Sequence, residues 1–440
     1  MPTTEHRALL VGSGAREHCI AEALRKNPAV EVYAVVGNRN PGIVRLAKET
    51  VHARMTDFET IGHFVDRIQP NLAIIGPEAP LAAGIADFLE KKGVPTIGPK
   101  KSLSQVESSK SFCRLLMKKY GIDGLPEFAV FDTMHGLQEY MNTLTGVVVK
   151  PDGLTGGKGV KVEGDHFEEL SEAIDYCQTI IQAGERVVVE EKLEGEEFSL
   201  QCFTDGSTVV PMPIAQDHKR AFEHDQGPNT GGMGSYSCPD HLLPFLTKQD
   251  KEEALRITRK VIEALLVECG EAYKGIIYGG FMKTAQGIKL IEYNCRFGDP
   301  EAMNALPLLR TDLYGICEAI VKGRLDRLDV RFELKASVCK YIVPEGYPQH
   351  PVRNERIRIL RSPPGSLTFY ASVDESEGEL VLKGSRAVAF VGIAESTAQA
   401  EAIAQEAAQG VEGPVFLRKD IGTDELISSR VEHMRELLGD

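Results

Sequence analysis

The first hundred residues alternate short apolar runs with helical patterns, and this alternation limits the possible folds more than any other feature. Apolar runs at 7–14 and 31–38 enclose a helical stretch at 15–27. Strands that alternate with helices form parallel, doubly wound sheets, whose ligands bind beyond the carboxyl ends of the strands. The pattern therefore predicts an N-terminal substrate-binding α/β domain over residues 1–103. The loops expected at its binding edge are 12–18, 37–42 and 76–81.

The first of these loops resembles a dinucleotide-binding fingerprint only in part. Gly12 and Gly14 fit G-x-G-x-x-G, but Glu17 occupies the position of the third glycine. The second strand ends at Asn38 without the acidic residue that would bind a ribose. The loop therefore argues against a nicotinamide cofactor. It favours a small anionic or amino-bearing substrate near Gly12, Gly14, Arg16 and Glu17.

Residues 150–160 hold four glycines and two lysines. Glycines bring backbone N–H groups close to an anion, and lysine adds a point charge for phosphate. The run is not a Walker A loop, because Asp152 stands at its first glycine position and Gly159 replaces the Ser or Thr. Apolar stretches at 146–150 and 159–163 flank it. We interpret it as a flap over a nucleotide triphosphate between two strands; a glycine-rich hairpin with solvated lysines is the alternative.

Glu292 and Asn294 are two residues apart on a predicted strand, so their side chains share a face. Magnesium prefers oxygen ligands, often one or two carboxylates with phosphates and water. A polar strand end is the alternative reading of this pair. Because Arg296 and Asp299 follow in the same short loop, we favour a site for a metal and a substrate. The strand belongs to a hairpin predicted to turn near Gly287.

Two other segments carry polar residues beside apolar strands. Glu190 and Glu197 flank a short linker, where an adenine and a ribose could be held, although charge runs are usually solvated surface. The segment 215–237 is long, polar and rich in glycine, and loops of this kind are often functional. His218 in this loop could act as a general base or serve a structural role.

The overall composition excludes several classes of protein. The formal net charge of −14 argues against a nucleic-acid or anionic-membrane surface. No apolar run reaches the roughly 18 residues of a membrane span, and the start lacks the layout of a signal peptide. The nine cysteines are scattered and predict buried free thiols. We therefore expect a cytoplasmic protein without nucleic-acid or membrane partners. Separately, the pattern at 397–411 predicts an amphipathic helix as the final element of the chain.

The flap, the acidic linker and the strand with Glu292 occur in the order typical of the ATP-grasp superfamily. Within it the chain resembles the glycinamide ribonucleotide synthetases along nearly its whole length. The matching segments are 12–18, 76–81, 109–112, 150–160, 190–199, 216–220, 227–234, 291–301, 346–348 and 418–422. The resemblance implies an α/β protein with the N-terminal doubly wound parallel sheet, an ATP-grasp domain over 104–333 and a small C-terminal α+β domain over 334–440. A flap-bearing subdomain is expected at about 124–196.

The resemblance also implies a reaction in purine biosynthesis. ATP phosphorylates glycine, and 5-phosphoribosylamine attacks the glycyl phosphate, which yields glycinamide ribonucleotide, ADP and phosphate. Mg²⁺ or Mn²⁺ is the implied metal. The implied state is a monomer or homodimer, with a possible channelling partner in the pathway. Rival readings are another ATP-grasp ligase or carboxylase of purine or biotin metabolism, and a nucleotide-binding regulatory module without catalysis.

Site residues follow from the resemblance position by position. The implied ATP contacts are Lys110, Lys150, Gly156, Gly157, Lys158, Gly159, Glu190, the Leu193 backbone and Glu197. The implied metal ligands are Glu292 and Asn294, and the residues nearest the chemistry are Arg296, Lys219, Asp217 and Asp299. The implied substrate contacts are Gly12, Gly14, Arg16, Glu17, Glu78, Asn229, Thr230 and Gly231. The chain departs from many superfamily members at Lys283 and Thr284, where a further metal carboxylate is common.

Overall fold

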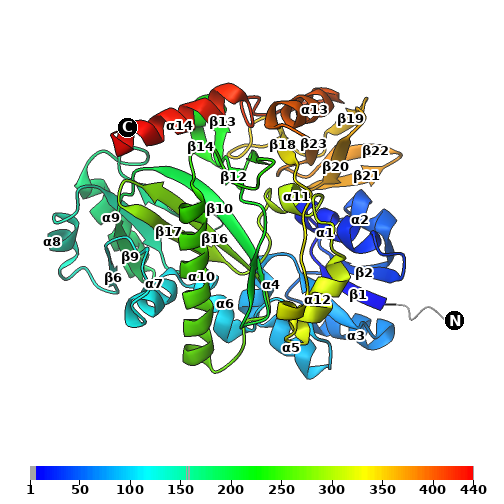
Figure 1. Cartoon of the computed structure of the whole chain (residues 1–440), viewed down its shortest axis with the longest axis horizontal. Coiled ribbons are helices and arrows are strands. Elements are labelled where there is room, and N and C mark those ends of the chain that lie inside the picture. The colour runs from blue at the N-terminus through cyan, green and yellow to red at the C-terminus, as the bar shows by residue number, and fades with distance from the viewer. Residues whose placement is uncertain (1–5, 155, 157–158, 440) are drawn as a thin grey trace.

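The structure is a computed structural model that describes residues 6–154, 156 and 159–439. Figure 1 shows its two ends on opposite sides of the molecule. The N-terminal sheet is parallel throughout, with the order β3-β2-β1-β4-β5, which confirms the predicted doubly wound domain. Its strands are β1 (His6–Val11), β2 (Val30–Val36), β3 (Ala47–His52), β4 (Leu72–Ile75) and β5 (Thr96–Ile97). Its helices are α1 (Ala15–Arg25), α2 (Pro41–Leu46), α3 (Phe58–Ile68), α4 (Glu78–Ala83) and α5 (Ile85–Lys91).

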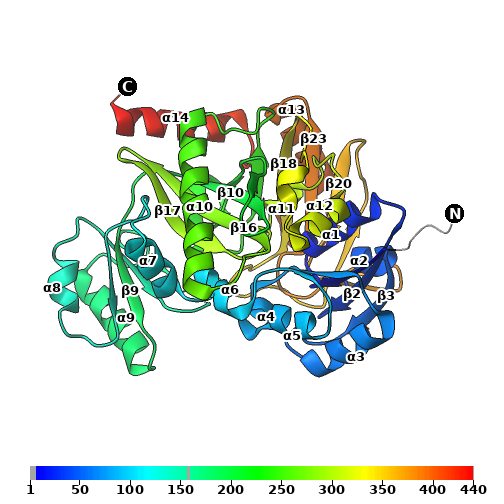
Figure 2. The ribbon, with the colours of Figure 1, turned by 60° about the horizontal axis from the view of Figure 1, so that its bottom comes forward.

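The predicted flap lies in a small subdomain with its own sheet and apolar core. Helices α6 (Lys101–Ser108) and α7 (Lys110–Lys119) lead into it. Its antiparallel sheet has the order β6-β9-β7-β8, and the run 150–160 joins β7 to β8 as the sequence predicts. Its elements are β6 (Phe128–Phe131), α8 (Leu137–Met141), β7 (Val147–Pro151), β8 (Lys161–Val162), α9 (Leu170–Gln182) and β9 (Val187–Glu191). Figure 2 shows this subdomain apart from the larger body of the protein.

A second antiparallel sheet, with the order β11-β10-β16-β17, forms the floor below the flap. The hairpin of β16 and β17 turns just before Gly287, which confirms the prediction. Helix α10 packs against three of these strands because its apolar side chains form one buried stripe. The elements are β10 (Glu196–Thr204), β11 (Val209–Pro211), α10 (Lys248–Cys269), β16 (Gly275–Thr284) and β17 (Gly287–Asn294).

The glycine-rich segment 215–237 connects the central and C-terminal regions. It contains β12 (Gln216–Asp217), β13 (Arg220–Phe222), η1 (Glu223–Asp225), β14 (Gln226–Asn229) and β15 (Gly234–Ser237). Strands β13 and β14 form a hairpin, while β12 and β15 continue the C-terminal sheet in the order β12-β15-β18-β23-β20, with β25 beside β18. The other strands of this sheet are β18 (Ala336–Pro344), β20 (Ser366–Tyr370), β23 (Val388–Ala394) and β25 (Val415–Phe416). This loop is therefore built into a sheet.

Smaller elements complete the fold. The helices after β17 are α11 (Ala302–Ala305), α12 (Leu313–Val321) and the short η2 (Leu325–Arg327). A second C-terminal sheet contains β21 (Val373–Ser376), β22 (Glu379–Leu382), β19 (Arg356–Ile359) and β24 (Val411–Glu412). Helix α13 (Thr397–Gln409) confirms the amphipathic helix expected at 397–411.

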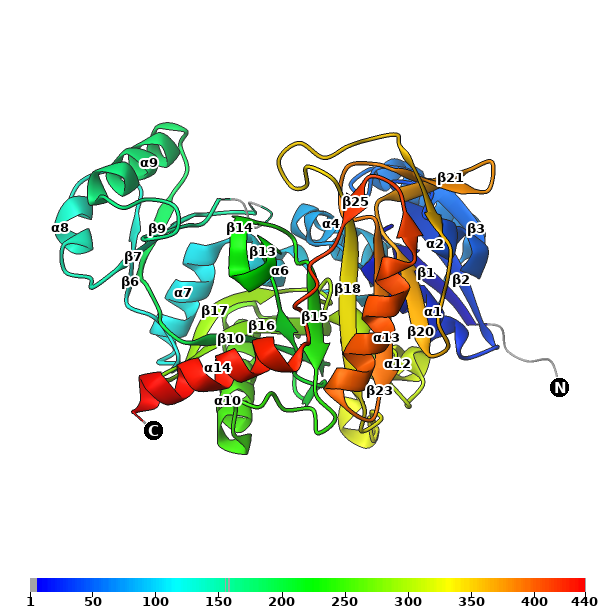
Figure 3. The same cartoon turned by 90° about the horizontal axis from the view of Figure 1, so that it is seen from above.

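The expectation that this helix is the final element is wrong. The chain continues through β24 and β25 into α14 (Asp424–Leu438), which extends from the C-terminal domain over the central one (Figures 1 and 3). Leu426, Ile427 and Met434 are buried, and Ile427 and Met434 join the same apolar core as Phe198 of β10. The predicted division at 334–440 therefore includes a helix that packs on the central domain.

The expected free thiols and the question of a membrane span concern the cysteines and the helices of the structure. All nine cysteines are free thiols, and eight of them are buried. Within the described ranges, no helix combines the length and apolar character required to cross a membrane.

Candidate active site

One cleft of about 800 Å³ brings together most of the residues selected from the sequence. The flap subdomain, β10, β17, the hairpin of β13 and β14, and the N-terminal domain all contribute to its walls. The predicted residues that line it are Arg16, Glu78, Lys110, Lys150, Gly156, Glu190, Leu193, Glu197, Asp217, Lys219, Asn229, Thr230, Gly231, Glu292, Asn294, Arg296 and Asp299. Segments distant in sequence therefore converge on one site. The roles assigned to the individual residues stay predictions.

A buried cluster of charges stands where the flap begins. Glu190 at the end of β9 accepts hydrogen bonds from Arg114 Nε at 2.7 Å and Arg114 Nη2 at 3.1 Å. Lys150 Nζ, at the end of β7, is 2.6 Å from Glu190 Oε2, the same oxygen that Arg114 Nη2 contacts. Burial alone would raise the pKa of Glu190, but the two cations lower it to about 2. The carboxylate therefore stays charged and holds Lys150 at the mouth of the flap.

The base of the flap is fastened to the start of α7. Asp152 accepts hydrogen bonds from the Ser111 backbone N–H at 3.1 Å and from the Ser109 hydroxyl at 3.0 Å. Lys110 Nζ donates to the Gly153 carbonyl at 2.6 Å. A carboxylate is favoured at a helix N-terminus, so Asp152 holds the turn after β7 against the start of α7. Gly159 accepts a hydrogen bond from Tyr176 at 2.9 Å, whereas Gly157 and Lys158 lie outside the described residues.

Three lysines surround Glu292 on β17. Burial would raise the pKa of this carboxyl group, but Lys219, Lys150 and Lys110 lower it below its usual value. Asn294 Nδ2 donates to Glu292 at 3.4 Å, so the two side chains lie side by side as the strand spacing predicts. Burial of Lys110 and its closeness to Lys150 lower the pKa of Lys110. The site thus combines several cations with two oxygen ligands, an arrangement suited to phosphates and a divalent ion.

Few side chains in the cleft could act as metal ligands. Among the described residues, no group of three or more His, Cys, Asp or Glu side chains is arranged to hold a metal ion. At the position of the further carboxylate common in the superfamily, Lys283 pairs instead with Asp250 at 2.5 Å. Glu292 and Asn294 leave most of an ion's coordination sphere open. That openness suits Mg²⁺, which keeps waters and substrate phosphates as ligands.

Arg296 lies between two carboxylates and the Asn294 amide. Its Nη2 is 3.3 Å from Glu107 and donates to Asn294 Oδ1 at 3.1 Å, and its Nε is 3.4 Å from Glu78. The last contact is an ion pair without hydrogen-bond geometry, because Nε has no hydrogen-bond partner in the part of the chain that the structure describes. Burial raises the pKa of Glu107 to about 7 despite Arg296. Glu107 also accepts the Cys295 backbone N–H at 2.7 Å, which fixes the loop that follows β17.

The segment 215–237 places its polar residues opposite β17. Lys219 Nζ is 3.0 Å from Glu197 across the cleft, and Glu197 is the main cause of the raised pKa of Lys219. Burial, reinforced by nearby Glu301, raises the pKa of Asp217 well above its usual value. Asp217 Oδ1 has no hydrogen-bond partner among the described residues. This free oxygen of a carboxyl group that lines the cleft is available for a hydrogen bond or a proton transfer with a bound substrate.

The second half of this segment is clamped by an arginine from the C-terminal domain. Arg386 donates to the Gly231 carbonyl at 2.6 Å and the Gly232 carbonyl at 3.1 Å, and its Nη2 is 3.1 Å from Asp299. Tyr341 donates its hydroxyl hydrogen to the other Asp299 oxygen at 2.6 Å. The two predicted substrate-binding loops are therefore fixed against each other by residues remote in the sequence.

Three residues of the first loop do not line the cleft. Glu17 accepts hydrogen bonds from the Gly14 N–H and from Arg16 Nε, both at 2.6 Å. A side chain at Gly12 would collide with Glu17, since its Cβ would lie 2.4 Å from Glu17 Cγ. Glu17 therefore holds the start of α1, and the predicted substrate contacts of Gly12, Gly14 and Glu17 stay predictions. Arg16 is the member of this loop that reaches the cleft.

Three family models together cover most of the chain. Residues 6–107, 108–302 and 337–424 match the N domain, the ATP-grasp (A) domain and the C domain of phosphoribosylglycinamide synthetase. The chain belongs to the phosphoribosylglycinamide synthetase family. A phosphoribosylamine–glycine ligase of Methanococcus vannielii is 49% identical over 443 residues, which cover 98% of this chain and 100% of the relative. One of Methanocaldococcus jannaschii is 49% identical over 442 residues, which cover 98% and 99%.

Solved structures agree with this assignment. The phosphoribosylamine–glycine ligase of Thermotoga maritima superposes with a TM-score of 0.79 at 28% identity and covers 94% of this chain and 100% of its own. The biotin carboxylase domain of the Hydrogenobacter thermophilus 2-oxoglutarate carboxylase has a TM-score of 0.72 at 16% identity and covers 98% and 93%. That second likeness shows the shared fold alone. The predicted family and three-domain architecture are therefore confirmed.

Several residues of this synthetase cleft escaped the sequence analysis. Arg114 follows Lys110 by four residues on α7 and thus shares its face, a signal that was available. Glu107 precedes Lys110 by three residues in a polar stretch without any distinctive pattern. Arg386, Arg430 and His433 line the cleft from the C-terminal region. No local pattern marks these three, because their partners are brought together only by the fold.

Proposed function

We propose that this chain ligates glycine to 5-phosphoribosylamine at the expense of ATP and releases glycinamide ribonucleotide, ADP and phosphate. The observation that carries the proposal is the convergence of Lys110, Lys150 and Lys219 on Glu292 within one cleft. Such a site matches phosphoryl transfer, which depends on positioning and on charge neutralisation. Relatives that carry the name phosphoribosylamine–glycine ligase and align along the whole chain support the same conclusion.

ATP occupies the part of the cleft between the flap and β17. Lys110 and Lys150 contact its phosphates, and Glu190 keeps Lys150 in place through the 2.6 Å ion pair. Glu190 and the Leu193 backbone hold the adenine, and Glu197 binds the ribose. Gly156, Gly157, Lys158 and Gly159 cover the phosphates. Closure of the flap excludes water, which would otherwise hydrolyse an acyl phosphate.

Glu292 and Asn294 hold Mg²⁺ or Mn²⁺. Their donor set fits such an ion, because a carboxylate and a carboxamide lie side by side at the end of one strand, the amide nitrogen of Asn294 facing Glu292 and its oxygen facing Arg296. The ion supplies charge neutralisation for the phosphates. Arg296 donates to the Asn294 amide oxygen and so orients this ligand.

The reaction has two steps. A carboxylate oxygen of glycine attacks the γ-phosphorus of ATP, so that ADP leaves and glycyl phosphate forms. The neutral amine of 5-phosphoribosylamine then attacks the glycyl carbonyl carbon, and inorganic phosphate leaves as the C–N bond forms. Arg296 and Lys219 offset the charge of the transferred phosphoryl group. Asp217 accepts, through its Oδ1, the proton that the amine loses; this oxygen has no hydrogen-bond partner among the described residues.

The two substrates lie between the N-terminal domain and the segment 215–237. Arg16 and Glu78 face them from the N-terminal domain, and Asn229, Thr230 and Gly231 from the end of β14 and the residues that follow it. Asp299 closes the pocket beside Arg386. The substrate contacts proposed for Gly12, Gly14 and Glu17 are indirect. Glu17 accepts a hydrogen bond from Arg16 at 2.6 Å and so holds Arg16 toward the substrates.

The test is release of ADP from the purified full chain with Mg²⁺. We expect release that requires both glycine and 5-phosphoribosylamine. Undiminished release without glycine would contradict the proposal, and bicarbonate replacing glycine would indicate a carboxylase.

Glu292→Gln tests the proposed metal site directly. It should reduce turnover by ~100-fold or more, because the phosphates lose a preorganised charge partner. Glu139→Gln on α8, an exposed carboxylate away from the cleft, is the matched control. Equal turnover in the two variants would contradict the assigned metal site.

A further inference from the structure

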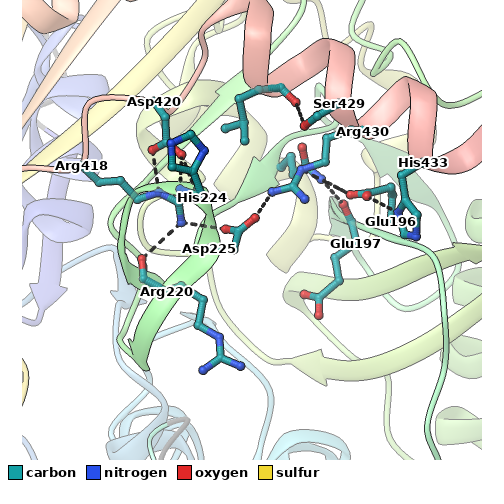
Figure 4. A network of polar contacts seen from close by, with 12 residues as sticks. Glu196, Glu197, Arg220, His224, Asp225, Arg418, Asp420, Ser429, Arg430 and His433 are labelled. Atoms are coloured by element: carbon teal, nitrogen blue, oxygen red, sulfur yellow. Dashed lines mark hydrogen bonds and ion pairs between the residues drawn. The ribbon is translucent and has the colours of Figure 1, made fainter. Parts of the chain in front are cut away.

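Two side chains of α14 reach into the cleft from the far end of the chain. Arg430 Nη2 pairs with Asp225, and Arg430 Nε lies 3.5 Å from Glu196 (Figure 4). His433 Nδ1 lies 2.7 Å from the other oxygen of Glu196. The match to the C-domain family model ends at residue 424, before both residues. One guanidinium therefore bridges two elements that carry proposed substrate-binding residues.

The first element is the hairpin of β13 and β14. Lys219 directly precedes it, Asn229 ends it and Thr230 directly follows it, so its placement sets three residues assigned to the substrates. At its tip, His224 and Asp225 have φ angles of 56° and 54°. Two adjacent residues other than glycine in the left-handed region are energetically costly and need support from their surroundings.

The support comes from the C-terminal segment. Besides Arg430, Arg418 Nη1 is 2.7 Å from Asp225, and the His224 N–H donates to Asp420 at 3.0 Å. Arg418 and Asp420 also pair with each other at 2.7 Å. The tip of the hairpin thus keeps its costly backbone geometry because cations and an acceptor after residue 417 hold it (Figure 4).

The second element is the start of β10. Glu196 is 4% exposed, and its neighbour Glu197 is the residue proposed to bind the ribose. Gln216 Nε2 donates to Glu196 Oε2 at 3.2 Å and to the Glu197 carbonyl at 3.1 Å. Successive strand residues point to opposite faces, so a fixed Glu196 fixes the backbone from which Glu197 projects.

We propose that Arg430 is a positioning residue that holds two parts of the cleft at a fixed distance. One is the nucleotide end, at Glu196 and Glu197 of β10, and the other is the hairpin of β13 and β14, here called the acceptor hairpin. The inference rests on the proposed function, since it uses the roles of Glu197 and of the hairpin. Arginine suits this task because its extended guanidinium can pair with two carboxylates at once, here through a hydrogen bond to Asp225 and an ion pair without hydrogen-bond geometry to Glu196. Anchorage of α14 does not require such a bridge, because Leu426, Ile427 and Met434 already bury the apolar face of the helix.

Arg430→Met in the full chain tests the bridge. We expect KM to rise by about tenfold for both ATP and glycine, with a smaller change in kcat, because the substrates meet a misplaced site while the reacting groups remain. Arg435→Met is the matched control: Arg435 is exposed on the same helix, and no ion pair to it is found among the described residues. The control should leave both KM values within about twofold of wild type.

Two further variants separate the arms of the bridge. Glu196→Gln should raise KM for ATP and leave KM for glycine within about twofold of wild type, while Asp225→Asn should do the reverse. Arg430→Lys should recover part of both losses. Unchanged KM values in both single-arm variants would overturn the inference, even if Arg430→Met failed to fold. So would a folded Arg430→Met that loses only thermal stability or kcat.

Failure of the proposed function would be distinguishable from failure of this inference. The former gives wild-type ADP release that does not depend on glycine. The latter gives glycine-dependent release in wild type together with KM values in Arg430→Met that equal those of Arg435→Met.

Discussion

Glu107 provides a quantitative test of the electrostatics around Arg296. The substitution is Glu107→Gln, which keeps the shape of the protonated side chain and removes its charge. Burial raises the pKa of Glu107 from 4.5 to about 7 in the folded protein. The folded state therefore binds the proton more tightly than the unfolded state does. The resulting stabilisation is fully present below pH 4.5 and is lost as the pH rises through 7.

The size of the effect follows from this shift in pKa. Each pKa unit corresponds to about 1.4 kcal/mol, so a shift from 4.5 to about 7 amounts to about 3 kcal/mol in the free energy of unfolding. An unfolding entropy of about 2.1 cal/mol/K per residue over 440 residues converts this into about 3–4 °C in Tm. At pH 5, where only a small part of the stabilisation is lost, the variant should melt less than about 1 °C above wild type. At pH 8 the variant should melt about 3–4 °C higher.

Circular dichroism is the suitable assay, because the chain contains no tryptophan. The melts are recorded with EDTA and without nucleotide, so that no bound ion alters the charge near Glu107. Glu139→Gln, an exposed carboxylate on α8, should shift Tm equally at both pH values. A difference between Glu107→Gln and wild type that is the same at pH 5 and pH 8 would refute the argument from burial.

Three shorter predictions concern other buried charges. Arg114→Met leaves buried Glu190 with Lys150 as its remaining ion-pair partner and should lower the free energy of unfolding by about 3–5 kcal/mol, measured by thermal melts. Its control is Arg186→Met, which removes a half-exposed ion pair and should lower it by less than ~1 kcal/mol. Burial lowers the pKa of His218 to about 3, so wild type should lose about 2 kcal/mol between pH 6.5 and pH 5, a loss that His218→Gln avoids in the same melts. Arg386→Met frees the Gly231 carbonyl and should raise KM for glycine without changing KM for ATP in steady-state assays; equal KM values for glycine would contradict the clamp.

The parts of this protein that the sequence predicts well are those set by short-range patterns. Alternating apolar runs identify the parallel sheet, because every strand must bury both faces while every helix buries one. The pair Glu292 and Asn294 is predictable because strand geometry alone puts both side chains on one face. The flap at 150–160 is equally visible, since its glycines and lysines are adjacent in the chain.

The charge clusters of the cleft could not be predicted in the same way. Arg114 and Glu190 are 76 residues apart, and Arg430 and Asp225 are 205 apart. Whether such charges meet depends on tertiary packing, about which no local pattern carries information. Helix α14 is a different case, because Thr423 as its N-cap and the apolar residues at 426, 427, 431 and 434 form a recognisable helical signature. The sequence therefore carries enough local information to predict this helix.

The two links between the nucleotide end and the acceptor hairpin respond differently to substrate. The inner link is the 3.0 Å ion pair of Lys219 with Glu197, and the outer link is Arg430 between Asp225 and Glu196. Under the proposed roles, ribose hydroxyls compete with Lys219 for Glu197, so nucleotide binding weakens the inner link and frees a lysine for the acyl phosphate. The outer link, together with Arg418 and Asp420 at the tip, then holds the hairpin in place while Lys219 changes partner. The protein has a net charge of −14 and yet gathers several cationic side chains in one cleft. Before the phosphates bind, a nearby carboxylate or carbonyl group stabilises each of these cations, as the Gly153 carbonyl does for Lys110.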